Sequence, residues 1–176
     1  RDQIAHLDGW IILEYSIPRL GARIDAILIV DHVLFVLEFK VFESTFPRNA
    51  LDQVYDYALD LKHFHQPSHN ILICPVLVAT DAPDHPVSVR FSSHSDGLVV
   101  PIACGGRQVG QVLSTVLGQT SGPQVVGEEW MSGRYLPTPT IVEAATALYR
   151  GHTVDEISKS EAAENLTATS GYLSYV

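Results

Sequence analysis

The residues best suited to chemistry are two acids and a lysine, Asp25, Glu38 and Lys40. Carboxylate oxygens suit Mg²⁺ or Mn²⁺, ions that keep several waters and readily add phosphate oxygens from a substrate. An ammonium group beside them can hydrogen-bond a water and stabilise charge on a phosphate, and burial that lowers its pKa would be needed for proton transfer. The residue types therefore indicate a site for metal-assisted chemistry on phosphate groups.

Two neighbouring β-strands are expected to position these groups, residues 22–30 and 33–41, because both are rich in Ile, Val, Leu and Phe. Only two residues separate them, which favours an antiparallel hairpin. Side chains alternate between the two faces of a strand, so Glu38 and Lys40 share one face. Asp25, on the neighbouring strand, can meet them on the same surface.

Two further oxygen ligands are candidates for the metal. The backbone carbonyl of Phe39 lies between the acid and the lysine of the second strand. Glu14 is the one charge in an apolar strand over residues 11–18, which would complete a three-stranded antiparallel meander. Glu14 then either sits beside Asp25 as an extra ligand or faces water at the edge of the sheet.

A purely structural role for the same charges is the alternative. A carboxylate or ammonium among apolar neighbours loses hydration and is tolerated when it is paired. Asp25, Glu38 and Lys40 could satisfy one another as a buried ion pair, and such pairs also perturb pKa values.

A helix is expected after the next loop, with Pro47 in its first turn. Its apolar residues recur at helical spacing and form a core stripe of Leu51, Val54, Ala58 and Leu61. Gln53 and Tyr57 lie one turn apart on an adjacent face, from which they can lean over the acidic end of the sheet. Alternatively, they are ordinary boundary residues of an amphipathic helix.

The apolar run 71–80 follows and is typical of a buried central strand. A strand, a helix and a strand in this order favour a parallel pair joined by a crossover. The sequence therefore predicts an α/β fold in which a mixed sheet carries helices on its faces.

The motif formed by these residues resembles that of the PD-(D/E)XK nuclease superfamily. Asp25 is followed after twelve residues by Glu38-Phe39-Lys40, and Gln53 with Tyr57 is similar to the Q-x-x-x-Y element of the RecB-like branch. One departure is Ile24, which stands where the motif often has proline. The match covers roughly residues 10–80. Several phrases, among them ARIDAIL, LEFK and LDQVYDYALDLKHFH, also resemble the nuclease-like N-terminal region that precedes a Schlafen-group-3-like DNA/RNA helicase domain.

The resemblance implies a restriction-endonuclease-like mixed central β-sheet flanked by helices. It also implies a nuclease that hydrolyses phosphodiester bonds of nucleic acid, DNA more than RNA, with Mg²⁺ or Mn²⁺. Asp25, Glu38 and the Phe39 carbonyl would hold the metal, Lys40 would act on the attacking water, and Gln53 and Tyr57 would position nucleic acid and water. A covalently linked helicase domain and a homodimer are the partners it suggests.

Two rival functions stay open. One is a nuclease-fold module that does not cut but binds DNA or docks the helicase domain, and the other is a purely structural domain. The net charge of −9 favours the first rival, because only three lysines and eight arginines are available to neutralise phosphates. The intact set of two acids and a lysine argues against it.

Composition describes a folded chain outside the membrane. Hydrophobic residues make up 46% of the 176 residues and charged residues 18%, which argues against disorder. No apolar run approaches the ~20 residues of a membrane helix, and no signal peptide is visible at the start. Cys74 and Cys104 are far apart without metal-site spacing, so we expect buried thiols of a cytoplasmic protein.

Three parts of the chain are distinguished by composition. Residues 1–120 are expected to form the nuclease-like domain, including a short strand at 87–91, a strand at 98–104 and a helix at 108–117. Residues 121–139 are an irregular Gly/Pro-rich connection. Residues 140–176 are a helical segment that would lead to a following helicase domain. The chain contains no nucleotide-binding loop.

Overall fold

A computed structural model describes residues 7–17, 22–92 and 97–136 of the chain. The chain forms two compact units, Arg1–Arg134 and Tyr135–Val176. Nearly all the described residues belong to the first unit, so the expected helical segment at 140–176 lies outside them. The proposed division at residues 120 and 139 therefore stays a prediction.

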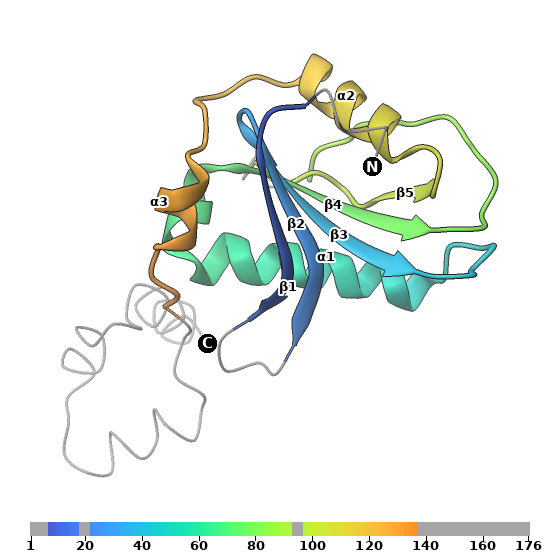
Figure 1. The fold of residues 1–176 in the computed structure, drawn as a ribbon, viewed down its shortest axis with the longest axis horizontal. Helices are drawn as coiled ribbons and strands as arrows, with labels where there is room; N and C mark the ends of the chain where they lie inside the picture. The colour runs from blue at the N-terminus through green and yellow to red at the C-terminus, as the bar shows by residue number, and fades with distance from the viewer. Residues whose placement is uncertain (1–6, 18–21, 93–96, 137–176) are drawn as a thin grey trace, which may run out of the picture. The chain divides into compact units, whose positions relative to one another are not determined.

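A five-stranded mixed sheet forms the centre of the first unit, in the order β1-β2-β3-β4-β5 (Figure 1). The strands are β1 (Trp10–Ser16), β2 (Arg23–Val30), β3 (Val33–Lys40), β4 (Leu72–Ala79) and β5 (Ile102–Gly105). The first three strands are antiparallel neighbours, whereas β3, β4 and β5 run parallel. The prediction of an α/β fold with a mixed sheet flanked by helices is confirmed.

The hairpin between β2 and β3 turns at Asp31 and His32, as the two-residue spacing predicts. Asp31 has a φ of 52°, the left-handed conformation that tight hairpins use and that Asp adopts more readily than most residues. The register then pairs Val30 with Val33 and Ala26 with Leu37. Glu38 therefore falls opposite Asp25, one position beyond the last paired residues.

Helix α1 (Arg48–Phe64) connects β3 to β4 and packs against both strands. Pro47 is its N-cap. Proline has no backbone N–H, and it loses no hydrogen bond at this position because the first N–H groups of a helix have no acceptor within the helix. The buried stripe consists of Ala50, Val54, Ala58, Leu61 and Lys62. Leu51 was expected in this stripe and is only half-buried, because Ala50 takes the innermost position of the first turn.

Lys62 is the one charged residue of this buried stripe. It is buried near the end of α1, where its Nζ donates a 2.7 Å hydrogen bond to the carbonyl oxygen of Ile71. The long apolar stem of a lysine can line a core while its charged end meets a carbonyl.

The opposite face of the sheet packs against α2 (Val109–Gln119). This core holds every second residue of β2, β3 and β4 together with three helix residues, Val112, Leu113 and Val116. The helix expected at 108–117 is thus confirmed with a shift of one or two residues. The expected strand at 87–91 is absent, since the structure shows only an isolated bridge between Phe91 and Val99 there.

A short helix, α3 (Gly127–Met131), interrupts the stretch that was expected to be irregular. It delivers Trp130, which is fully buried and packs at 4.5 Å, centroid to centroid, on the ring of His65. The indole Nε1 donates a 2.9 Å bond to Ser68 Oγ, which in turn lies 2.8 Å from His65 Nδ1. This helix could not be predicted from the sequence, because a single turn carries too few apolar residues to show the helical period.

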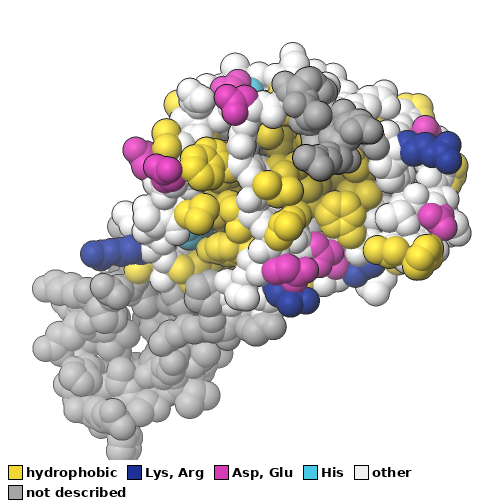
Figure 2. Space-filling model, in the orientation of Figure 1, with side chains coloured by type: hydrophobic (Ala, Val, Ile, Leu, Met, Phe, Trp, Pro, Cys, Tyr) yellow, Lys and Arg dark blue, Asp and Glu magenta, His cyan; other side chains and the backbone are white. Residues whose placement is uncertain are grey.

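The edge strand β1 is largely exposed. Trp10, Ile11 and Leu13 keep 41%, 59% and 63% of their surface. Figure 2 shows hydrophobic side chains gathered over β1 and β2, with charged groups at the lower rim. No helix among the described residues is long and apolar enough to cross a membrane.

Candidate active site

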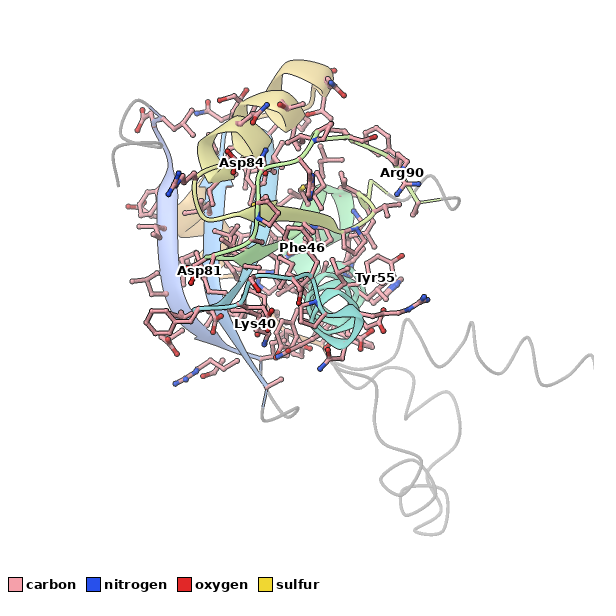
Figure 3. The ribbon with its side chains drawn as sticks, turned by 90° about the vertical axis from the view of Figure 1, so that its right-hand side faces the viewer. Lys40, Phe46, Tyr55, Asp81, Asp84 and Arg90 are labelled. Carbon is pink, nitrogen blue, oxygen red and sulfur yellow. The ribbon has the colours of Figure 1, made fainter. Side chains whose placement is uncertain are left out.

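The site lies where β2 begins and β3 ends, on the face of the sheet covered by α1. Side chains alternate between the two faces of a strand. Leu37 packs in the core on the opposite face of the sheet, so Glu38 and Lys40 lie on the face that α1 covers. In Figure 3 this end of the sheet faces the viewer. Lys40 lies beside the start of α1, and Asp81 and Asp84 lie beyond the end of β4.

Lys40 connects the acid of the strand to the helix. Its Nζ donates a 2.7 Å hydrogen bond to Glu38 Oε1 and a 3.2 Å bond to Gln53 Oε1. Gln53 Nε2 in turn donates a 2.6 Å bond to the hydroxyl oxygen of Tyr57. Four of the residues selected from the sequence therefore form one continuous chain of hydrogen bonds.

The helical spacing explains how Gln53 and Tyr57 take part. Residues four apart lie on the same side of a helix, one turn above the other. The buried Val54 and Ala58 fix the rotation of α1 on the sheet. The adjacent stripe of the helix, with Gln53 and Tyr57, is therefore half-buried. Gln53 is thereby held with its amide oxygen towards the lysine.

Asp25 joins the site through the backbone of β3. Its Oδ2 accepts a 2.8 Å hydrogen bond from the backbone N–H of Phe39. The ladder between β2 and β3 stops at the pair Ala26–Leu37, so the carboxylate takes the place of the next strand partner. Asp25 is half-buried, and the register of the two strands puts it opposite Glu38.

Glu38 is the most constrained group of the site. Only 4% of its surface is exposed, and Oε2 is buried without a hydrogen bond from any described residue. Burial raises the pKa of its carboxyl above the ordinary value, and the negative charge of Asp25 adds to this, while the hydrogen bond from Lys40 opposes it. An additional positive charge near this carboxyl would therefore stabilise its ionised form.

Glu14 forms an ion pair with an arginine of the neighbouring strand. The register places it opposite Asp25, but it adopts a φ of 56° and its Oε2 pairs with Arg23 Nε at 2.5 Å. Both side chains are more than half exposed, so the ion pair contributes little to stability. The role of Glu14 as a metal ligand stays a prediction.

The side-chain donors for a metal are two carboxylates. In the part of the chain that the structure describes, no three His, Cys, Asp or Glu side chains are grouped as a metal site. Asp25, Glu38 and the carbonyl of Phe39 would therefore have to be completed by water and substrate, as is usual for Mg²⁺. The buried, unpartnered Oε2 of Glu38 fits such an ion.

Two residues near the site were not selected from the sequence. Phe42 lies in the turn after β3 and Thr80 directly follows β4, and the Phe42 N–H donates a 2.8 Å bond to Thr80 Oγ1. The signal that could have indicated this turn is an aromatic residue in a polar loop, two positions after the lysine.

A cavity of about 410 Å³ lies elsewhere on the sheet. His32, from the turn between β2 and β3, lines it together with Pro67 and Trp130, and none of the selected site residues does so. The cavity is therefore separate from the cluster at the other end of β3.

Comparison with protein-family models, curated proteins and solved structures finds no match to this chain. The resemblance to PD-(D/E)XK nucleases therefore rests on the motif residues of the sequence alone.

Proposed function

We propose that this chain is a metal-dependent nuclease of the PD-(D/E)XK type, with a restriction-endonuclease-like fold, that hydrolyses phosphodiester bonds in DNA. The observation that carries the proposal is the continuous hydrogen-bonded chain from Glu38 through Lys40 and Gln53 to Tyr57. These residues are distributed over two elements, and a structural ion pair needs only the first two of them.

The residues that would hold Mg²⁺ or Mn²⁺ are Asp25 and Glu38, with the carbonyl of Phe39. A cation bound there would neutralise charge on the phosphate oxygens and polarise the bond under attack. Two carboxylates held close to each other repel, and the charge of Asp25 adds to the burial that raises the pKa of Glu38. A positive ion between them relieves that repulsion.

Lys40 is the group that would act on the water. An ammonium has three N–H donors, and the bonds to Glu38 and Gln53 use two of them. The third can hold the attacking water or a phosphate oxygen, since a third of the lysine side chain is exposed. Its positive charge is then fixed next to the charge that develops on the phosphate.

Gln53 would position the lysine rather than react. Its amide oxygen accepts from Lys40 while its amide nitrogen is tied to Tyr57, so the rotamer of the amide is set from both sides. A positioned ammonium loses less freedom when the substrate binds, which lowers the barrier.

A module that binds DNA without cutting it is the second candidate. Two observations favour it. Lys40 and Glu38 form an ion pair at 2.7 Å that already neutralises both groups. The chain also has a net charge of −9. In this case a helicase domain in the same protein, or a second copy of the chain, would supply the basic surface.

Metal titration of the purified chain separates the candidates. Labelled linear and circular DNA, single and double stranded, is incubated with EDTA, Mg²⁺ or Mn²⁺. The nuclease predicts cutting only with a divalent ion, and loss of cutting on circles would identify an end-dependent enzyme. Binding without cutting in every condition supports the second candidate, and neither binding nor cutting supports a structural domain.

A further inference from the structure

The turn after β3 exposes two apolar side chains directly beyond Lys40. Val41 keeps 64% of its surface and Phe42 keeps 85%, the largest exposed fraction among the large hydrophobic residues of the described part. A phenyl ring in this position contributes almost nothing to the core. Its size and chemistry are therefore available to a ligand.

Hydrogen bonds fix the backbone of the turn that carries this ring. Phe42 has a φ of 61°, a conformation that bulky residues rarely adopt. Its N–H is bound to Thr80 Oγ1 at 2.8 Å, and the N–H of Thr80 donates a 3.1 Å bond to the carbonyl of Lys40. One residue further, Asp81 N–H donates to the carbonyl of Glu43 at 3.0 Å. The turn is thus fastened to the end of β4 on both sides of the ring.

The ring is also close to the proposed site. Phe42 is two residues from Lys40, so their Cα atoms are separated by at most about 7.6 Å. A nucleic acid whose phosphate meets the lysine would bring a neighbouring base within reach of the phenyl group.

The charge of the chain favours a contact of this kind. With a net charge of −9, phosphate neutralisation can supply little affinity. Arg23, a cation on the strand of Asp25, is already paired with Glu14. Stacking of a base on an aromatic ring needs no positive charge and tolerates any sequence. In an intact duplex the bases stack on each other and are not available.

We infer that Phe42 is a stacking platform for an unpaired base next to the scissile phosphate, so that the substrate is a single strand or a frayed end. This inference rests on the proposed nuclease function for the position of the phosphate. The stacking itself can be measured without cleavage.

The test uses the whole 176-residue chain and a short thymidine oligonucleotide that carries one 2-aminopurine. EDTA is present, so that binding is observed without cutting. Stacking on Phe42 quenches the fluorescence of the base beyond the quenching within the free strand. Phe42→Ala should remove this added quenching and weaken binding by about tenfold, while Phe42→Trp should retain both. Phe91→Ala is the matched control, because Phe91 is also exposed, at 52%, and lies in a different loop.

The outcomes distinguish this inference from the nuclease proposal. Quenching that depends on Phe42, in a protein that never cuts with Mn²⁺, supports the platform and refutes the nuclease. Metal-dependent cutting that is equal on single strands and blunt duplexes, and unchanged in Phe42→Ala, overturns the platform and leaves the nuclease standing. Absence of binding by the unaltered protein, or equal quenching by Phe42→Ala, also overturns the platform.

Discussion

The carboxylate of Asp25 accepts a hydrogen bond from the backbone N–H of Phe39 at 2.8 Å. This bond ties the acid near the start of β2 to the strand that carries Glu38 and Lys40. It forms where the regular ladder between the two strands has ended. The position of the Asp25 carboxylate is therefore fixed by the backbone of β3.

Replacing Asp25 by Asn should separate charge from geometry. The amide oxygen can still accept from Phe39, so the free energy of unfolding should fall by no more than about 1 kcal/mol. Metal-dependent cleavage should fall by at least about a hundredfold, because a hard anionic ligand is lost. Urea unfolding and initial cleavage rates measure the two effects.

Asp52→Asn is the control for this change. Asp52 is an exposed carboxylate on α1, and its loss alters the net charge by the same amount. If both variants cut at the same rate as the unaltered protein, Asp25 has no part in metal binding.

Divalent ions should stabilise the folded chain. An ion that binds only the native state raises the free energy of unfolding by RT ln(1 + [L]/Kd), which amounts to about 2.7 kcal/mol at a concentration of one hundred times Kd. We expect Mg²⁺ and Mn²⁺ to raise the melting temperature and Na⁺ at equal ionic strength to leave it unchanged. The increase should be absent in Glu38→Gln, and an equal increase in that variant would place the ion elsewhere.

Gln53→Ala and Tyr57→Phe should reduce activity to different degrees. Gln53 contacts the lysine directly, so its loss frees the ammonium and should slow cleavage by about tenfold to a hundredfold. The tyrosine hydroxyl acts only through Gln53, so Tyr57→Phe should have the smaller effect. The reverse order, measured as kcat with KM determined separately, would show that Tyr57 contacts the substrate itself.

The stability of the fold should depend on pH through His65. Burial lowers the pKa of this histidine from 6.5 to about 4, and the nearby His69 adds to the shift. The unfolded chain therefore binds more protons than the native one between pH 6.5 and 4. Stability should be complete above pH 6.5 and should fall as the pH decreases towards 4, by up to about 3 kcal/mol.

His65→Gln should flatten this dependence, since glutamine does not titrate. The emission of Trp130, which packs on the histidine, follows unfolding at each pH. An unchanged slope in the variant would assign the acid sensitivity to other groups.

The sequence predicted most of the sheet because its signals are local. The apolar runs with a two-residue turn defined the hairpin, and the apolar run of β4 with the preceding helix defined the parallel pair. Alternation was sufficient to bring Glu38 and Lys40 together. Helical spacing was sufficient to bring Gln53 and Tyr57 together.

Other features depend on contacts between distant residues and could not be obtained this way. The pairing of Glu14 with Arg23 depends on a left-handed backbone conformation that a glutamate does not signal. Helix α3 buries Trp130 against His65 and Ser68, which follow α1 and lie more than sixty positions earlier. The backbone of Phe42 is held by a bond to Thr80, which follows β4 and lies 38 positions later.

The proposed nuclease activity is tested by the cleavage of labelled single-stranded DNA with Mn²⁺, by the unaltered chain and by Lys40→Ala in parallel. Both proteins must show the same circular dichroism spectrum. We expect the unaltered chain to cut, EDTA to stop the reaction, and Lys40→Ala to cut at least about a hundredfold more slowly. Equal cutting by the two proteins would refute the role of Lys40, because the group that links the acid to the helix would then have no part in the reaction.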